Sequence, residues 1–313
     1  MLKVIVISLL ANPIAKSISN IPSVKSLAFK YVGAEDIESF INNKINDILN
    51  DNYKITISFL GEHYHSQEDI ERYKKNVLDI IRKISVFQNV TVSIKLTALG
   101  LDMDYEYCKD NLGEIIEFAS KFNIRIHIDM EQSIYIDNSL SLFDLYRKEY
   151  KYNNLDITFQ AYLYRTSKDI EDRILSFDWD SRPIVRICKG AYKEPFDKVF
   201  PNKKLIDENY YNISVKMLDN IQKVYPAFAT HDHKIIEKIK NYVQYKGISI
   251  DSFEFQMLYG IRQDLQRKII DQGYNLRIYI PIGSEWYDYF VRRIAEKPSN
   301  ILLVLYSLLK RQK

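Results

Sequence analysis

The chain has 313 residues, 46% of them hydrophobic, which is enough for one large domain or two small ones with a full-sized core. Its net charge is +3 and no basic run carries interleaved aromatic residues, so a nucleic-acid-binding protein is excluded. The two cysteines exclude a disulfide framework and a cysteine metal site and favour a reducing cytosol, and no apolar stretch approaches the ~20 residues of a membrane span.

Taken in chain order, residues 1–50 lack strand alternation, and we expect a helical N-terminal arm before a catalytic domain at 51–313. From there, short β-branched segments alternate with amphipathic helical patterns. The predicted strands are Lys54–Leu60, Val90–Thr97, Ile124–Asp129, Asp156–Leu163, Pro183–Lys189, Pro226–His231, Ile250–Gln256 and Leu276–Ile280. The clearest helical patterns are Gln67–Ile84, Leu205–Val224, His233–Tyr245 and Ile261–Asp271. Eight strand–helix units predict an α/β fold of the (β/α)8, or TIM, barrel type.

The predicted strands alternate polar and apolar residues. In 124–129, for example, arginine, histidine and aspartate alternate with isoleucines. Parallel strands covered by helices are normally almost entirely apolar. We therefore place the apolar side chains against the helices and the polar ones inside the barrel, where they must satisfy one another or a ligand. Part of this set forms a structural network low in the barrel.

The upper part of the polar set lies where barrel enzymes place their sites, at the C-terminal strand ends. Its members are Lys95, Asp129, Gln160, Arg186, His231, Gln256 and Tyr279. Two further segments belong to the same predicted site. In 184–192, Gly190 and Ala191 let the backbone approach a ligand closely, and 228–232 ends a strand with hydroxyl and imidazole donors. The set is cationic, so it predicts an anionic ligand.

The chain is organised around residues 277–296. Pro281 and Gly283 end the last predicted strand, Ser284 can cap a helix, and helical spacing begins at Trp286. Trp286, Tyr289, Arg293 and Glu296 share one side of this helix, and Arg292 can pair with Glu296 one turn later. A guanidinium fork beside aromatic walls suits a small carboxylate with an apolar body.

Two alternatives stay open. His63-x-His65 and His231-x-His233 allow a metal-dependent, amidohydrolase-like barrel, although the last strand offers no carboxylate to complete such a site. A non-catalytic barrel that binds a small acid is the other alternative.

Several motifs, in this order along the chain, resemble those of the proline dehydrogenase family, single-function type. They are 95–100 (KLTALG), 128–131 (IDME), 160–163 (QAYL), 186–192 (RICKGAY), 229–231 (ATH), 253–260 (FEFQMLYG), and Tyr279 followed by Arg292-Arg293-x-x-Glu296. The resemblance covers about residues 30–300, and the last motif is its most specific part. It implies a distorted barrel that binds FAD, with the eighth helix moved over the barrel mouth.

The resemblance also implies roles. Arg292, Arg293 and Lys95 bind the proline carboxylate, and Tyr279, Tyr289 and Leu258 pack around the ring. Asp129 and Arg186 hold the catalytic positions, with Arg186 beside the flavin N5. The residues at flavin-binding positions are Met130, Gln160, Arg186, Lys189, Gly190, Ala191, Thr230, His231 and Gln256. Two departures from the family pattern are Asp232, where Asn is common, and Lys193, where several members carry an aromatic residue. We expect the negative charge of Asp232 to weaken FAD binding.

By the same resemblance, the reaction oxidises L-proline to Δ1-pyrroline-5-carboxylate by hydride transfer to flavin N5, the first step of proline catabolism. The final electron acceptor can be a membrane quinone. The tail Ile301–Lys313 is apolar and ends in cations, so it fits either a helix packed against the barrel or an interfacial membrane anchor. We therefore expect a cytoplasmic enzyme that can lie peripherally at the inner face of the membrane.

Overall fold

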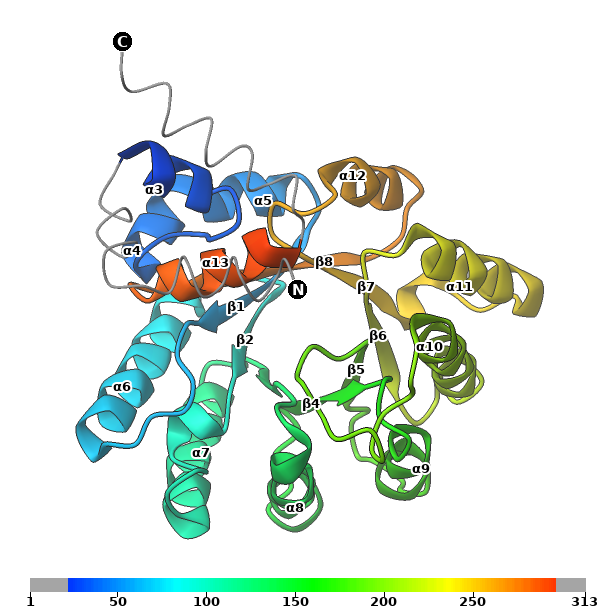
Figure 1. The fold of residues 1–313 in the computed structure, drawn as a ribbon, viewed down its shortest axis with the longest axis horizontal. Helices are drawn as coiled ribbons and strands as arrows, with labels where there is room; N and C mark the ends of the chain where they lie inside the picture. Colours follow the sequence, from blue (N-terminus) through cyan, green and yellow to red (C-terminus); the bar gives the residue numbers. More distant parts are fainter. Residues whose placement is uncertain (1–21, 297–313) are drawn as a thin grey trace.

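The computed structural model describes residues 22–296. Eight strands close into a barrel in which each strand pairs in parallel with the next and β8 pairs with β1 (Figure 1). The strands are β1 Lys54–Phe59, β2 Val90–Ile94, β3 Ile126–Ile128, β4 Leu155–Gln160, β5 Ile184–Cys188, β6 Tyr225–Ala229, β7 Glu254–Leu258 and β8 Leu276–Ile282. The predicted (β/α)8 barrel is confirmed.

Helices surround the barrel (Figure 1). They are α6 Gln67–Ile84, α7 Tyr105–Ser120, α8 Ile136–Asp144 with η5 Leu145–Glu149, α9 Thr166–Ile170 with η6 Glu171–Leu175, α10 Lys203–Leu218, α11 His233–Lys246 and α12 Gln263–Asp271. The predicted bounds of α6 are those observed. The Ser66 side chain accepts a hydrogen bond from the Asp69 N–H and fixes the first turn of α6.

Helices also precede the first strand. They are α3 Pro22–Ala28, α4 Ile37–Phe40, η2 Ile41–Ile45 and α5 Asn46–Asn50. Phe40 and Ile45 are fully buried in the main core, so this segment packs on the barrel. Residues 1–21, the start of the predicted arm, lie outside the described residues.

The seventh predicted strand, Ile250–Gln256, is wrong in its first half. Residues Ile250–Ser252 form the short 3-10 helix η7, and β7 begins at Glu254. The Ser249 side chain accepts a hydrogen bond from the Asp251 N–H, and this local bond competes successfully with a strand. The predicted second and fourth strands also ran too far. After Ile94 and Gln160 the chain bends into local turns, such as the 3-10 helix η3, Thr97–Leu99.

The last strand continues through Pro281, where the sequence predicted a stop. The carbonyls of Tyr279 and Pro281 point to the same side of β8, accepting hydrogen bonds from the N–H groups of Tyr259 at 3.0 Å and Gly33 at 2.8 Å. Proline has no backbone N–H to donate. At Pro281 this costs no strand–strand hydrogen bond, because the neighbouring strand β7 has already ended at Leu258. Helix α13, Trp286–Glu296, then begins at Trp286, where the helical spacing was predicted to begin.

Helix α13 lies across the β1 and β8 end of the barrel, next to α3 (Figure 1). Trp286 and Phe290 from α13 are buried with Ala28, Val32 and Leu60 in a second apolar cluster. The Phe29 and Trp286 rings lie 5.7 Å apart. This packing holds α13 over the barrel end, as the sequence predicted for the eighth helix.

Polar side chains fill the lower barrel interior. Arg277 donates to both Glu254 carboxylate oxygens, at 2.6 and 3.2 Å. Arg125 donates to Asp156 through two N–H groups, at 2.7 and 2.5 Å. Burial, with the nearby arginines, lowers the pKa of His127 well below its usual value, so this imidazole is neutral. These paired groups are the structural network that the strand alternation predicted.

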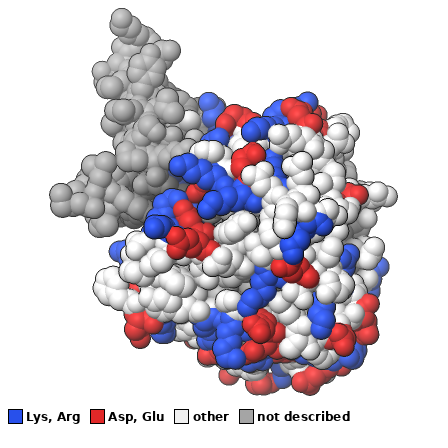
Figure 2. All heavy atoms as spheres, turned by 90° about the vertical axis from the view of Figure 1, so that its right-hand side faces the viewer, with Lys and Arg blue, Asp and Glu red and all other residues white. Residues whose placement is uncertain are grey.

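Charged side chains of both signs are interspersed over the face shown in Figure 2, in keeping with the small net charge of +3. None of the helices within residues 22–296 combines the length and the apolar character that a bilayer crossing requires.

Candidate active site

Asp129 follows β3 and is the centre of a hydrogen-bonded cluster at the barrel mouth. One carboxylate oxygen accepts from Ser93 Oγ at 2.7 Å and from Arg186 Nη1 at 2.5 Å. The other accepts from the Tyr279 hydroxyl at 2.5 Å. Three predicted residues from β3, β5 and β8 are thus brought together, and Ser93 on β2 is an additional member.

Hydrogen bonds and burial hold the Arg186 side chain in one orientation. Its side chain is 5% exposed, and its Nε donates to Gln256 Oε1 at 2.5 Å. Gln256 in turn donates to Glu254 at 2.7 Å, which ties the mouth to the lower network. The Arg186 Nη2 atom is buried and has no hydrogen-bond partner among the described residues. A buried guanidinium N–H without a partner is a donor available to a ligand.

Tyr279 closes one side of the cluster. The Arg186 guanidinium lies 5.2 Å from the centre of its ring. Burial and the adjacent Asp129 carboxylate raise the pKa of Tyr279 well above its usual value. The phenol therefore stays protonated and donates to Asp129, while its ring contacts Arg186.

Gln160 ends β4 and offers a second open polar atom. Its Nε2 donates to the Met130 backbone carbonyl at 3.1 Å. Its Oε1 is buried and has no partner within residues 22–296. Arg186 and Gln160 therefore present one donor and one acceptor from neighbouring strands. A planar heterocycle whose edge carries N–H, C=O and ring nitrogen groups can accept a hydrogen bond from Arg186 and donate one to Gln160.

The backbone of the turn after β5 contains a glycine that no larger residue can replace. Gly190 has φ +105°, and a Cβ at this position would stand 2.2 Å from the Tyr162 ring. Only glycine fits both the backbone conformation and the space. Ala191 beside it is exposed. Lys189 in the same turn forms ion pairs with Asp207 at 2.5 Å and Asp232 at 2.9 Å.

The turn after β6 is ordered by its own side chains and by β7. Thr230 Oγ1 accepts from the Asp232 N–H at 3.1 Å. The His231 Nε2 accepts from the Leu258 N–H at 2.9 Å, which places the proton of a neutral imidazole on Nδ1. His231 and Leu258, predicted to contact flavin and substrate, thus contact each other.

Asp232 departs from the family pattern, but its charge is compensated. Lys189 and Lys203 donate to it at 2.9 and 3.1 Å. Burial of Asp232 raises its pKa, but the two lysines outweigh this effect and hold the pKa well below the usual value. Lys203 and Asp207 were not predicted for this site. Their i,i+4 spacing at the start of α10 was the available signal.

Lys95 follows β2 and forms an ion pair with Glu62 at 2.7 Å. Both side chains are partly exposed at the barrel mouth. Sequence reasoning missed Glu62. The signal was its position directly after the first strand, where βα loops carry functional residues.

Helix α13 supplies the remaining predicted substrate residues. Tyr289 is buried, and the guanidinium of the half-buried Arg293 lies 5.3 Å from the centre of its ring. The predicted arrangement of a guanidinium beside an aromatic ring is therefore present for Arg293. The side chains of Arg292 and Glu296, and hence their predicted ion pair, lie outside the described residues.

One histidine of each predicted pair is engaged in other contacts, His231 with Leu258 and His63 with two side chains. His63 Nδ1 lies 2.7 Å from Asp102, and His63 Nε2 lies 3.1 Å from Gln132. Between residues 22 and 296, no three His, Cys, Asp or Glu side chains are grouped in a way that could hold a metal ion.

The fold and this mouth define a (β/α)8-barrel enzyme with a hydrogen-bonded Arg–Asp–Tyr cluster, open polar atoms and a glycine turn beside it. The sequence profile of the proline dehydrogenase family matches residues 41–301. The chain is 40% identical over 286 residues to proline dehydrogenase 2 of Bacillus subtilis strain 168, covering 91% of both proteins. It is 37% identical over 290 residues to proline dehydrogenase of Deinococcus radiodurans, again covering 91% of both.

Among solved structures, the fold is similar to that of proline utilization A (PutA) from Bdellovibrio bacteriovorus, inactivated by N-propargylglycine. The TM-score is 0.78 at 24% identity, over 90% of this chain but only 33% of the other. The chain thus spans about a third of the solved protein, and this comparison supports the fold alone. The chain belongs to the proline dehydrogenase family. This membership decides against the metal hydrolase and the non-catalytic barrel as alternatives.

Proposed function

We propose that this proline dehydrogenase family member uses FAD to oxidise L-proline to Δ1-pyrroline-5-carboxylate. The observation that carries the proposal is the cluster of the buried Arg186 with Asp129 and Tyr279, in which the guanidinium Nη2 is open to a ligand. The open Oε1 of Gln160 and the glycine-only turn at Gly190 fit the same cofactor. When bound, FAD would accept at N5 the hydride that leaves the ring carbon next to the proline nitrogen.

Arg186 would serve the cofactor in two ways. Its fixed orientation, set by Asp129 and Gln256, would hold the open N–H toward the polar edge of the flavin. Its positive charge would stabilise negative charge that develops there during the reaction, without any side-chain rearrangement. Lys189, Ala191, Thr230 and Met130 lie in the turns around this position and complete the proposed binding surface.

Substrate recognition falls to the mouth and α13. Arg293, together with Arg292 and Lys95, would bind the proline carboxylate by charge-assisted hydrogen bonds. Tyr279, Tyr289 and Leu258 would pack around the ring methylenes. Because Lys95 is paired with Glu62, the carboxylate of proline must compete with Glu62 for this ammonium. Fixing the carboxylate sets the position of the reacting ring carbon.

We further propose that electrons leave the enzyme for a membrane quinone or another acceptor, at the inner face of the membrane. Support comes from the sequence of 301–313, which is apolar and ends in cations. Flotation with anionic liposomes at low salt tests this step. A protein truncated after Ser299 should keep its activity with a soluble dye but lose flotation; if the full chain does not float, the membrane contact is ruled out.

A visible spectrum with and without proline tests the main proposal. The purified protein, supplied with FAD, should absorb as an oxidised flavin, and proline should bleach it under anaerobic conditions. Arg186→Lys should lower FAD retention, because a lysine cannot supply the same fork. Arg173→Lys is the matched control, since Arg173 also pairs with an aspartate, Asp144, but on the surface. A protein that never takes up FAD, or binds proline without bleaching, would contradict the proposal.

A further inference from the structure

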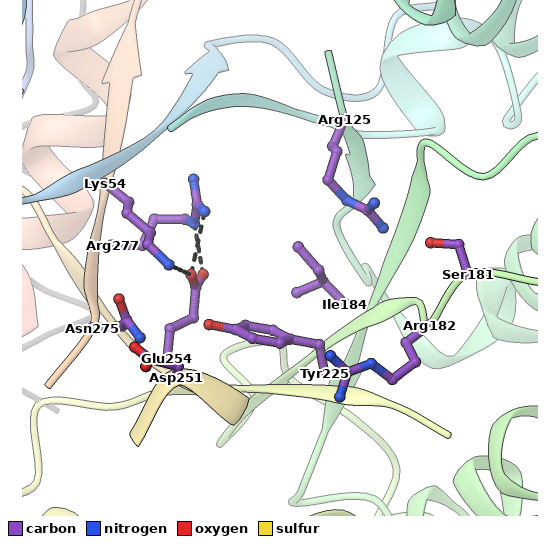
Figure 3. Close-up of a pocket in the computed structure, with 10 residues that line it drawn as sticks. All are labelled: Lys54, Arg125, Ser181, Arg182, Ile184, Tyr225, Asp251, Glu254, Asn275 and Arg277. Carbon is purple, nitrogen blue, oxygen red and sulfur yellow. Dashed lines mark hydrogen bonds and ion pairs between the residues drawn. The ribbon is translucent and has the colours of Figure 1, made fainter. Parts of the chain in front are cut away.

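A separate cavity of about 410 Å³ is lined by the residues drawn in Figure 3. It lies at the starts of the strands, whereas Asp129 follows the end of β3. Four of its lining residues, Lys54, Ile184, Tyr225 and Glu254, are the first residues of their strands, whereas the candidate active site gathers at the C-terminal strand ends. None of the residues assigned to flavin or proline lines this cavity. Its chemistry therefore needs an explanation of its own.

The lining is rich in cations. Four basic side chains, Lys54, Arg125, Arg182 and Arg277, face two acidic ones, Asp251 and Glu254. A lower barrel end that served packing alone would need its charges paired and no open space between them. Which of these cations are fully paired decides what the cavity can bind.

Arg277 and Glu254 form the rigid wall. The Arg277 guanidinium uses Nε and Nη2 on the Glu254 carboxylate and Nη1 on the backbone carbonyl of Ile55. Both side chains are buried, and Glu254 also accepts from Gln256. Each of the three guanidinium nitrogens of Arg277 has a partner in this wall, so the pair shapes the cavity and recognition falls mainly to other groups.

Arg125 is paired on one edge only. Its Nε and Nη2 donate to Asp156, while its Nη1 forms no hydrogen bond with any residue in the 22–296 range. In Figure 3 the Arg125 side chain reaches into the open space from one wall, and the Tyr225 hydroxyl points into it from another. Burial first, and then the nearby Glu254 carboxylate, raise the pKa of Tyr225, so this phenol stays a donor.

Lys54 and Arg182 add charge at the rim. The Lys54 ammonium forms an ion pair with Glu254 at 3.6 Å, a distance too long for a hydrogen bond, and its side chain is partly exposed. Arg182 is exposed and donates through Nη1 to the Ile221 carbonyl at 2.5 Å, which fixes the guanidinium without neutralising it. The Arg182 guanidinium has no carboxylate partner among the described residues and Lys54 is paired without a hydrogen bond, so both cations and the Tyr225 phenol can still donate to an anion beside the free edge of Arg125.

We propose that this cavity binds a small oxyanion of the phosphate type, either free phosphate or the phosphate group of a small molecule. Guanidinium forks and an ammonium are the donors that recognise such an anion with charge-assisted hydrogen bonds. The volume is in the range of small-molecule pockets, so a body attached to the phosphate also fits. Since the donors come from β1, β3, β5 and β6 or the loops just before them, the bound anion ties several strand starts together and stabilises the barrel.

Titration calorimetry on the full-length, FAD-loaded protein tests the proposal, with inorganic phosphate and glycerol 3-phosphate as probes and chloride at matched ionic strength as the blank. We expect one site per chain and a melting temperature that rises with either probe. Arg182→Gln and Lys54→Met should each weaken binding by roughly tenfold or more. The controls Arg82→Gln and Lys75→Met remove the same charges from the exposed face of α6 and should change nothing.

The experiment distinguishes the two possible ligands, free phosphate and a phosphorylated small molecule. Tighter binding of glycerol 3-phosphate indicates a phosphorylated small molecule, and equal binding indicates phosphate itself; both support the site. Three results overturn it. The first is no heat above the chloride blank at millimolar probe. The second is binding that both cavity variants leave unchanged. The third is binding that proline displaces, because this places the anion at the barrel mouth.

Discussion

Gly190 offers a quantitative test of how the β5 turn is built. Alanine at this position meets two separate obstacles. The backbone φ of +105° disfavours any residue with a Cβ, and that Cβ would lie 2.2–2.5 Å from three atoms of the Tyr162 ring. Tyr162 is 7% exposed, so the ring has little room to move away. Gly247, the C-cap of α11, isolates the first obstacle, because its φ is +66° and nothing lies within 4 Å of the place that an alanine methyl group would occupy.

The loss of unfolding free energy can be predicted separately for the two glycines. Backbone strain alone should cost Gly247→Ala roughly 1–2 kcal/mol of unfolding free energy. Gly190→Ala should cost a similar amount plus about 1–3 kcal/mol for overpacking against Tyr162, hence roughly 2–5 kcal/mol in all. Replacing Tyr162 by alanine in the Gly190→Ala background should recover the overpacking part, so the two substitutions should be strongly non-additive.

Equilibrium urea unfolding followed by far-UV circular dichroism measures these differences, and flavin absorbance of the purified variants measures cofactor retention. Gly190→Ala should lose FAD, whereas Gly247→Ala should retain it. Equal destabilisation of the two variants, or additive effects of Gly190→Ala and Tyr162→Ala, would show that the ring contact does not constrain the turn.

Three further predictions concern charge and reactivity. Arg293→Met should raise the KM for proline by the equivalent of roughly 2–5 kcal/mol without loss of FAD, and an unchanged KM would place the carboxylate elsewhere. Asp232 has a lowered pKa in the folded state, so its stabilising pairs with Lys189 and Lys203 are complete above its ordinary value of about 4 and are lost as pH falls below it. The difference in unfolding free energy between the natural protein and Asp232→Asn should therefore be present at pH 7 and shrink in acid; a difference that grows in acid would refute the pairing. Burial raises the pKa of the Cys188 thiol to about 11 and also raises that of Cys108, so iodoacetamide at pH 8 should label neither in the folded protein and both in denaturant.

The sequence predicted the barrel because alternation and spacing are local signals. It failed where a local bond overrides them, as at Ser249, and where a proline loses nothing because its neighbouring strand has ended, as at Pro281. It also missed partners that are distant along the chain. The position of Glu62 after the first strand and the spacing of Lys203 and Asp207 were signals of possible function, but neither indicated that Glu62 pairs with Lys95 or Lys203 with Asp232.

Alternation indicates which face of a strand a side chain occupies, but not its height in the barrel. Arg277 and Tyr279 share the inner face of β8, two residues or about 7 Å apart along the strand. The pairing register sets Arg277 opposite Lys54, at the start of β1, and Tyr279 opposite Thr56. Arg277 consequently binds Glu254 in the lower network, whereas Tyr279 reaches Asp129 at the mouth.

Gln256 lies between these two levels. It accepts from Arg186 and donates to Glu254, so the orientation of the proposed flavin-facing guanidinium depends on the paired charges below it. Arg277 and Glu254, which neutralise each other low in the barrel, therefore also serve the mouth. Through Gln256 they hold fixed the buried Arg186 guanidinium, whose Nη2 stays open there.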